Sequence, residues 1–300
     1  MEKTVIEIRP QGYCGGVLKA IQMAKETRKK YPKEKITVLG NLVHNQYVKK
    51  ALELLEIQTI ENSQKTRLEL LDEVNTGVVI FTAHGVSTRV KEKAFEKGLI
   101  CVDASCPFVL QTQKVVKEKL DEGFEIFYIG KNKHPEAEAI YSTSEKVHLI
   151  QKIEDIPTGI TSPVFVTNQT TMSIMDIKTI FDAIAQSYPD ALFHDEICNA
   201  TRVRQQAILD LKNQEIDALV VVGDPSSNNT RKLAQIGSQS NINLVVSAES
   251  VEQIHLEDFK GATRIAITSG ASTPTYLTQQ IIAYLKDPSN KQKIRIEELL

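Results

Sequence analysis

The residues with the clearest chemical potential are three cysteines, Cys14, Cys106 and Cys198. They follow one another at equal intervals of 92 residues (106 − 14 and 198 − 106). Each follows a short loop and opens a segment with helical periodicity. Equal spacing in similar local contexts predicts a threefold internal repeat that brings one thiol from each repeat to a common centre. A set of three thiolates without a fourth is typical of a metal centre that has one coordination position open for chemistry.

Two kinds of metal centre fit three thiolates, and the sequence favours an iron–sulfur cluster over zinc. Structural zinc normally takes a fourth ligand, often at short spacing, and the sequence has no CxxC pair. A 4Fe–4S cluster held by three cysteines leaves one iron open, and the absence of a CxxxCxxC loop counts against radical use of S-adenosylmethionine. A helix N-terminus favours the thiolate at each of the three positions. Cys101 has no equivalent in the repeats, and we interpret it as a small core residue.

The segments around the cysteines repeat a helix, a strand and a polar loop. Strands are expected at 36–40, 126–130 and 219–223, and a second set of passages from strand to polar loop at 79–84, 164–170 and 265–272. The predicted fold is α/β, with three pseudo-threefold-related α/β lobes that have small, mainly parallel sheets around a central iron–sulfur cluster. The predicted lobes are residues 1–103, 104–195 and 196–300, the last with a C-terminal tail. The apolar faces of the three helices are expected at Val17, Ala20, Ile21 and Ala24, at Val109, Val116 and Leu120, and at Val203, Ala207, Ile208 and Leu211.

Neutral polar side chains recur in the loops that follow these strands, where parallel sheets form their ligand crevices. They are His44, His84, His134, Thr170, Ser227, Asn229 and Ser272. Donors of this kind suit a phosphate or diphosphate group. Asp224 argues against an anion at its own position and is expected to point away. Glu136 is open to two interpretations, a solvated glutamate at a helix start or a proton donor beside a reducible centre.

Composition limits the classes of protein further. The net charge of −2 and the pI near 6.3 argue against a broad nucleic-acid surface. The longest apolar runs are too short to span a bilayer, and the first ten residues lack the apolar core of a secretory signal. We therefore expect a cytoplasmic protein with no nucleic-acid or membrane partner, present as a monomer or weak dimer.

With these motifs in view, the chain closely resembles the LytB family of 4-hydroxy-3-methylbut-2-enyl diphosphate reductases over nearly its whole length. The motifs occur in the order of the family: GYCGGV, VHNQYV, AHGVS, DASCP, HPEAEA, NQTT, ICNAT, SNN and SGAS. The resemblance implies that the chain catalyses the last step of the methylerythritol phosphate route to isoprenoids. In that step the allylic hydroxyl is removed reductively, which yields isopentenyl and dimethylallyl diphosphate. It also implies an electron donor such as ferredoxin or flavodoxin.

The resemblance assigns roles to individual residues. Cys14, Cys106 and Cys198 match the ligands of a 4Fe–4S cluster with one open iron. Glu136 matches the residue that delivers protons, and Thr170 matches the threonine that orders the substrate hydroxyl and the proton relay. The substrate-diphosphate contacts are matched by His44, His84, His134, Ser227, Asn228, Asn229 and Ser272. Family members often have serine where this chain has Asn228, whose backbone N–H offers an alternative contact.

Two other classes are compatible with an open iron–sulfur site. A non-redox hydro-lyase would turn over without an electron donor, whereas a reductase would not. An iron–sulfur sensor would be expected to carry an added DNA-binding or partner-binding segment, and the sequence shows none.

Overall fold

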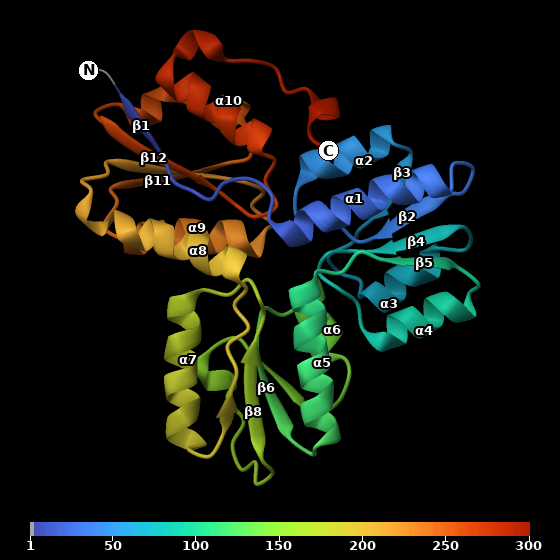
Figure 1. The fold of residues 1–300 in the computed structure, drawn as a ribbon. Coiled ribbons are helices and arrows are strands. Elements are labelled where there is room, and N and C mark those ends of the chain that lie inside the picture. Colours follow the sequence, from blue (N-terminus) through green and yellow to red (C-terminus); the bar gives the residue numbers. More distant parts are fainter. Residues whose placement is uncertain (1–2) are drawn as a thin grey trace. The chain divides into compact units, whose positions relative to one another are not determined.

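The computed structural model describes residues 3–300, apart from the side chain of Asn213, and contains three four-stranded sheets within them (Figure 1). The chain divides into two compact units. Unit 1 comprises the chain up to Val17, His44–Ala51 and Asn199–Leu300, and unit 2 comprises Leu18–Val43 and Leu52–Cys198. Every strand pair in the three sheets is parallel, as predicted.

Unit 1 is built around one sheet with helices on both faces. Successive residues of a strand point to opposite faces, so Val220 and Val222 pack against α10 while Leu219 and Val221 pack against α8 and α9. Burial on both faces explains why these strands read as continuous apolar runs. The elements are β1 (Thr4–Glu7), α8 (Asn199–Leu209), β10 (Ala218–Val222), α9 (Asn228–Gln239), β11 (Leu244–Ala248), β12 (Arg264–Ser269) and α10 (Thr275–Lys286).

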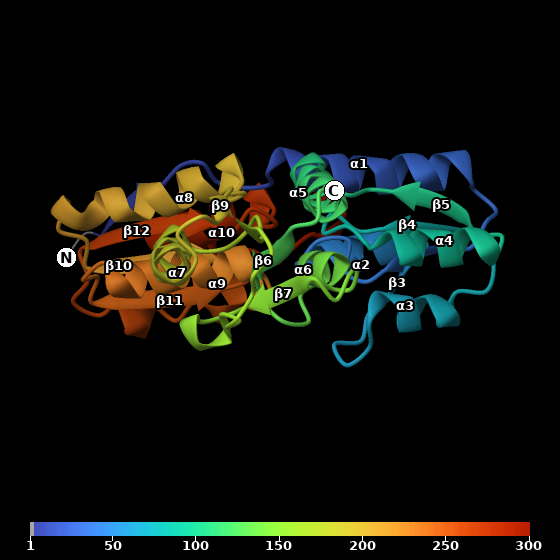
Figure 2. The same cartoon turned by 90° about the horizontal axis from the view of Figure 1, so that it is seen from below.

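The first sheet of unit 2 lies between α1 on one side and α3 on the other (Figures 1 and 2). Its core joins apolar residues of the strands, such as Leu39 and Phe81, to Leu70 of α3 and Val90 of α4. Each such fully buried side chain contributes about 1.5–3 kcal/mol to folding. The elements are α1 (Gly15–Lys30), β2 (Ile36–Leu39), α2 (Gln46–Leu54), β3 (Ile57–Ile60), α3 (Arg67–Leu70), β4 (Val78–Phe81), α4 (Thr88–Glu96) and β5 (Ile100–Asp103). Helices α1 and α2 each begin in unit 1 and end in unit 2.

The second sheet of unit 2 repeats this arrangement. Phe127 and Val166 face α7, whereas Tyr128 and Phe165 lie on the opposite face with α5 and α6. The elements are α5 (Pro107–Asp121), β6 (Glu125–Ile129), α6 (Pro135–Tyr141), β7 (Val147–Ile150), β8 (Val164–Asn168), α7 (Ile174–Ser187) and β9 (Leu192–Phe193).

The strand order is the same in all three sheets and differs from the predicted lobes at one point. The orders are β3-β2-β4-β5, β7-β6-β8-β9 and β11-β10-β12-β1. The fourth position of the last sheet is therefore filled by the N-terminal strand, whose Val5 pairs with Ile265. Residues 4–7 thus lie in the sheet of the third predicted lobe rather than the first. The β-branched residues of this segment favour a strand but contain no information about its distant partner.

The apolar faces predicted for the three cysteine helices are confirmed with one exception. Val17, Ala20, Ile21 and Ala24 are all buried. In α8, however, Val203 is 37% exposed, and the buried face is formed by Thr201, Arg204, Gln205 and Ile208. These positions follow the i, i+3, i+4, i+7 pattern of a helix face. The prediction was wrong at Val203 because three of the four inward-facing residues are polar.

Candidate active site

The three cysteines occupy equivalent positions in the three sheets. Each follows the fourth strand of a sheet and lies at the start of a helix, α1, α5 or α8. Its backbone N–H donates to a carbonyl two residues beyond the end of the third strand. The pairs are Cys14 with Ala271 at 3.0 Å, Cys106 with Ala83 at 2.9 Å, and Cys198 with Thr170 at 3.1 Å. One backbone contact thus fixes each cysteine to a polar loop within its own unit.

The environments of the cysteines separate Cys101 from the other three. Cys14, Cys106 and Cys198 are half-buried, and each lies within one residue of a helix start. Cys101 lies in β5 but is exposed, so its interpretation as a core residue was wrong. Its thiol contacts the Leu99 carbonyl at 3.6 Å, and partial burial together with Asp103 raises its pKa. A raised pKa disfavours the thiolate that binds metals.

Glu136 is held by Thr170 in unit 2. The backbone N–H of Thr170 donates to one carboxylate oxygen at 2.7 Å, and its Oγ1 donates to the other at 3.1 Å. Glu136 is 2% exposed, which excludes the interpretation as a solvated glutamate. Because the Thr170 carbonyl also accepts from Cys198, a single threonine connects the buried acid to a predicted cluster ligand.

Burial controls the protonation of Glu136. It raises the pKa of the carboxyl from 4.5 to about 7, although the two hydrogen bonds from Thr170 act in the opposite direction. The carboxylate of Glu196 adds a smaller rise of the same sign. A carboxyl with a pKa near neutrality is partly protonated at physiological pH, which is the requirement for a general acid.

Two of the predicted histidines lie together in unit 2. The rings of His84 and His134 meet edge to face, with centroids 5.5 Å apart. His134 is the N-cap of α6, and its Nδ1 accepts the backbone N–H of Glu136 at 3.2 Å. An accepting Nδ1 places the ring proton of a neutral His134 on Nε2, where it can be donated to a ligand. The remaining histidine, His44, belongs to unit 1.

A common offset places His44, His134 and Ser227 at matching positions. Each lies four residues beyond the glycine that ends the first strand of its repeat (44 − 40, 134 − 130 and 227 − 223). Each also lies at the start of a helix: His134 and Ser227 are N-caps, and Asn45 caps α2 by accepting from Tyr47 and Val48. His84 and Ser272 also occupy matching positions, in the loops that follow β4 and β12. Each directly follows the residue whose carbonyl accepts the backbone N–H of a cysteine.

Unit 1 gathers the neutral polar residues around the start of α9. Ser227 Oγ accepts from Thr230 at 3.3 Å, and Ser272 Oγ donates to the His44 carbonyl at 2.9 Å. Asn229 is 4% exposed, and neither its amide nitrogen nor its amide oxygen has a hydrogen-bond partner among the described residues. A buried amide without partners is costly unless a ligand satisfies it. Asn228 accepts from Arg231 at 3.3 Å.

Asp224 has a structural role in the same unit. One carboxylate oxygen accepts the backbone N–H of Gln46 at 3.0 Å, at the start of α2, and the other accepts from the backbone N–H of Ser226 at 2.7 Å. Both oxygens are therefore engaged by donors of the fold. This arrangement agrees with the expectation that Asp224 does not approach an anionic ligand.

Sequence reasoning missed the residues that hold the Cys14 loop. Buried Arg204 donates from Nη2 to the Gly12 carbonyl at 2.8 Å. Gly12 has φ +78°, and a Cβ there would lie 2.1 Å from Oγ1 of Thr275, so this turn admits only glycine. The i, i+3, i+4, i+7 polar face of α8 was the available signal for Arg204.

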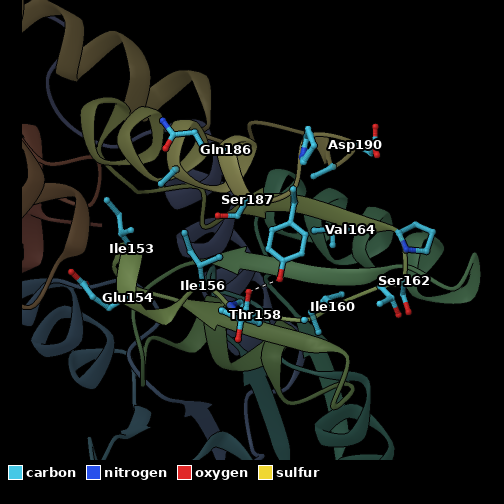
Figure 3. Close-up of a pocket in the computed structure, with 18 residues that line it drawn as sticks. Ile153, Glu154, Ile156, Thr158, Ile160, Ser162, Val164, Gln186, Ser187 and Asp190 are labelled. Atoms are coloured by element: carbon cyan, nitrogen blue, oxygen red, sulfur yellow. Dashed lines mark hydrogen bonds between the residues drawn. The ribbon is translucent and has the colours of Figure 1, made fainter.

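A separate pocket of about 920 Å³ lies at the far end of the second sheet of unit 2 (Figure 3). Ile156, Ile160 and Val164 line it, and Ser187 and Asp190 approach from the end of α7 and beyond (Figure 3). None of its lining residues, all within the described chain, is a predicted site residue or carries a positive charge. Because the acidic side chains of Glu154 and Asp190 also line it, the pocket does not suit a diphosphate.

The predicted residues fall into two groups, each brought together within one unit. Unit 2 holds His84, His134, Glu136 and Thr170 with Cys106 and Cys198, and unit 1 holds Cys14, His44, Ser227, Asn228, Asn229 and Ser272. All lie in loops or helix starts beyond the carboxyl ends of parallel strands, where α/β enzymes carry their sites. Together with the raised pKa of a buried acid, this placement defines the chain as an α/β enzyme.

Comparison with known proteins identifies the family. The LytB protein family matches residues 5–286, and this chain belongs to it. A 4-hydroxy-3-methylbut-2-enyl diphosphate reductase of Bacillus cytotoxicus is 42% identical over 310 aligned residues, which cover 99% of this chain and 97% of that protein. A protein with the same description from Brevibacillus brevis is 43% identical over 94% of this chain and 91% of its own length.

Solved structures agree with this placement. The E-1-hydroxy-2-methyl-but-2-enyl-4-diphosphate reductase of Plasmodium falciparum superposes with a TM-score of 0.89 at 30% identity, over 98% of this chain and 92% of its own. A second structure, described as the terminal enzyme of the non-mevalonate pathway, gives a TM-score of 0.64 at 28% identity over 96% of this chain and 100% of its own. In the described part of the chain, no helix combines the length and apolar composition that a membrane span requires.

Proposed function

We propose that this chain reductively removes the allylic hydroxyl of 4-hydroxy-3-methylbut-2-enyl diphosphate and yields isopentenyl and dimethylallyl diphosphate. The reaction consumes two electrons and two protons and releases water. One observation carries the proposal: the buried Glu136 carboxylate accepts two hydrogen bonds from Thr170, whose carbonyl accepts the backbone N–H of Cys198. A proton donor is therefore connected directly to a predicted redox ligand, in a chain of the LytB family.

The proposed cofactor is a 4Fe–4S cluster held by Cys14, Cys106 and Cys198. These thiols fit such a group because each is half-buried, lies at a helix start and is anchored by the same backbone contact. Soft sulfur donors suit iron–sulfur clusters, and a set of three leaves one iron available. When bound, the cluster would supply single electrons and Lewis-acid assistance to loss of the hydroxyl.

Glu136 supplies protons in this proposal. Thr170 holds both carboxylate oxygens in place, so the acid has one defined orientation when the proton is transferred. Its pKa of about 7 keeps part of the population protonated at neutral pH, and the loss of a proton recreates an anion that burial disfavours. Transfer to either end of the allylic carbon skeleton accounts for two products.

The diphosphate would be bound by neutral donors. His134 offers its Nε2–H, and the unpartnered amide of buried Asn229 offers two more N–H donors near the start of α9. His44, His84, Ser227, Asn228 and Ser272 complete the proposed set. Hydrogen bonds to a charged group contribute about 1.5–3 kcal/mol each, so a few of them suffice without a lysine or arginine cluster.

The electron donor would be a small redox protein such as ferredoxin or flavodoxin. The cytoplasmic location, the monomeric or weakly dimeric state and the lack of nucleic-acid partners stay predictions from the sequence. The three residue ranges of the lobes also stay a proposal, with residues 4–7 reassigned to the third sheet.

Anaerobic turnover of the diphosphate substrate with and without a reduced donor tests the activity. We expect products only with the donor, and turnover without it would instead indicate a hydro-lyase. Iron analysis tests the ligands: we expect about four irons per chain, and serine at position 14, 106 or 198 should abolish iron binding. Exposed Cys101 supplies the matched control, because Cys101→Ser should keep its iron. Full iron content in Cys198→Ser would refute the ligand assignment.

A further inference from the structure

The last seven residues of the chain, Ile294–Leu300, lie against unit 1, and we call them the C-terminal strap. Leu299 is 3% exposed. It packs in one apolar cluster with Tyr47 and Ala51 of α2 and Leu277 of α10. Partly buried Ile294, Ile296 and Leu300 of the strap pack around the same cluster. The strap therefore covers the beginning of α2, where Tyr47 lies three residues after His44.

The strap also contacts the loop of Cys14. Tyr13 Oη donates to the Leu299 carbonyl at 2.9 Å. Tyr13 directly precedes Cys14. Leu299 thus packs against the segment after His44 through its side chain, and it accepts a hydrogen bond from the residue before Cys14 through its backbone carbonyl.

Helix α10 anchors the strap independently of both segments. Tyr276 Oη accepts the backbone N–H of Arg295 at 3.2 Å, and Gln280 Nε2 donates at 3.3 Å to the carbonyl of Lys293, the residue just before the strap. These contacts fix the strap to an element whose core packs against the sheet of unit 1. The strap can consequently transmit the position of α10 to the segments that it covers.

The two covered segments need such support because of how the chain runs. His44–Ala51 is an excursion of the chain into unit 1, with unit 2 residues on both sides of it in sequence. Cys14 lies three residues before the point where the chain leaves unit 1. Side-chain and backbone contacts, rather than chain connectivity, must hold the His44 segment to the unit. The strap provides contacts of this kind to both segments.

We propose that Leu299 and Tyr13 are positioning residues, through which the C-terminal strap sets the placement of the Cys14 thiol and of the His44 loop. The proposal deepens the proposed function, because it concerns one assigned cluster ligand and one assigned diphosphate contact. The strap contains none of the residues assigned to the iron–sulfur cluster or to the substrate. Its contribution is to restrict the two segments further than the contacts of Ser272 and Arg204 already do, which lowers the entropic cost of binding.

The test uses the full chain with three variants and a matched control. Leu299→Ala removes most of the Leu299 side chain from the apolar cluster with Tyr47, Ala51 and Leu277. Leu299→Met restores an apolar side chain of similar volume, and Tyr13→Phe removes only the hydroxyl. Glu298→Ala is the control, because its side chain lies in the strap but forms an exposed ion pair with Arg295. Michaelis constants, turnover numbers and hydrogen–deuterium exchange are measured for each protein at a temperature where all are folded.

We expect Leu299→Ala to raise KM for the diphosphate about tenfold with a smaller change in kcat, and to increase exchange in residues 44–51. Leu299→Met and Glu298→Ala should behave like the wild type. In the iron-free full chain, Leu299→Ala and Tyr13→Phe should increase the alkylation rate of Cys14 relative to exposed Cys101, which serves as the internal reference.

A lower melting temperature in Leu299→Ala with unchanged KM, exchange and Cys14 alkylation would overturn the positioning role. Exchange and alkylation require no turnover, so the two proposals can fail separately. If the wild type lacks reductase activity but Leu299→Ala still opens both segments, the proposed function fails and the strap contacts are supported.

Discussion

Replacing Glu136 by glutamine tests the central electrostatic argument. Because burial raises the folded pKa to about 7, above the ordinary 4.5, the fold favours the protonated carboxyl. The stability linked to this group is fully present below about pH 4.5 and is lost as the pH rises through about 7. The rise in pKa corresponds to about 3 kcal/mol, and about 2 kcal/mol of it falls between pH 5.5 and 8.5.

Glutamine has nearly the same shape, can accept the Thr170 N–H and cannot ionise. The variant should therefore gain stability relative to the wild type as the pH rises, by about 2 kcal/mol between pH 5.5 and 8.5. Urea unfolding of both proteins across this range measures the difference. A difference that does not depend on pH would refute the assignment of a raised pKa.

The same substitution should reduce turnover by about 10²–10⁴-fold, with iron content and substrate affinity retained. In the wild type, turnover that needs the protonated acid should fall about tenfold for each pH unit above 7. Glu138→Gln is the matched control, because Glu138 lies on the same helix and accepts the Arg67 backbone N–H, which glutamine can also accept. Near-normal turnover of Glu136→Gln would remove Glu136 from the proton path.

Three further substitutions extend the test. Thr170→Val removes the Oγ1 hydrogen bond to the Glu136 carboxylate, so the pKa of Glu136 should rise further. The alkaline limb of the pH–rate profile should move to higher pH by about one unit, and a move to lower pH would contradict the argument. Asn229→Ala should raise KM about tenfold but change the free energy of unfolding by less than about 1 kcal/mol in urea titration, because its amide has no partner in the described chain; unchanged KM would remove it from the site. Gly40→Ala should destabilise the protein by about 2 kcal/mol or more in the same assay, because Gly40 has φ +97° and a Cβ would lie 2.5 Å from the Arg67 guanidinium. If the variant were as stable as the wild type, Arg67 would be able to move aside.

Much of the fold could be predicted from local patterns. The strands at 36–40, 126–130 and 219–223 appear as β2, β6 and β10, within one residue at each end. Parallel strands with both faces covered read as apolar runs, and amphipathic helices repeat every 3.6 residues, so one segment suffices to recognise each element. The predicted apolar face of α8 was wrong at Val203, because the side of this helix that is buried depends on the neighbours against which its side chains pack.

Part of the candidate site could also be predicted, because its residues are distinctive in type and spacing. The equal intervals between Cys14, Cys106 and Cys198 predicted equivalent positions, and the shared backbone contacts confirm the equivalence. Glu136 was chemically ambiguous in the sequence, since a glutamate after a proline at a helix start is usually solvated. Its burial and its two hydrogen bonds from Thr170, 34 residues away, resolve the ambiguity.

The sequence by itself determined the element types, the parallel α/β class and the three cysteines, because each depends on local periodicity or on side-chain chemistry. Only the tertiary structure decided the partner of β1, the pKa of Glu136, the exposure of Cys101 and the contacts of Leu299. Strand pairing, desolvation and packing all depend on residues far apart in the chain. A side chain such as that of Glu136 acquires its chemical character from the neighbours that folding brings to it.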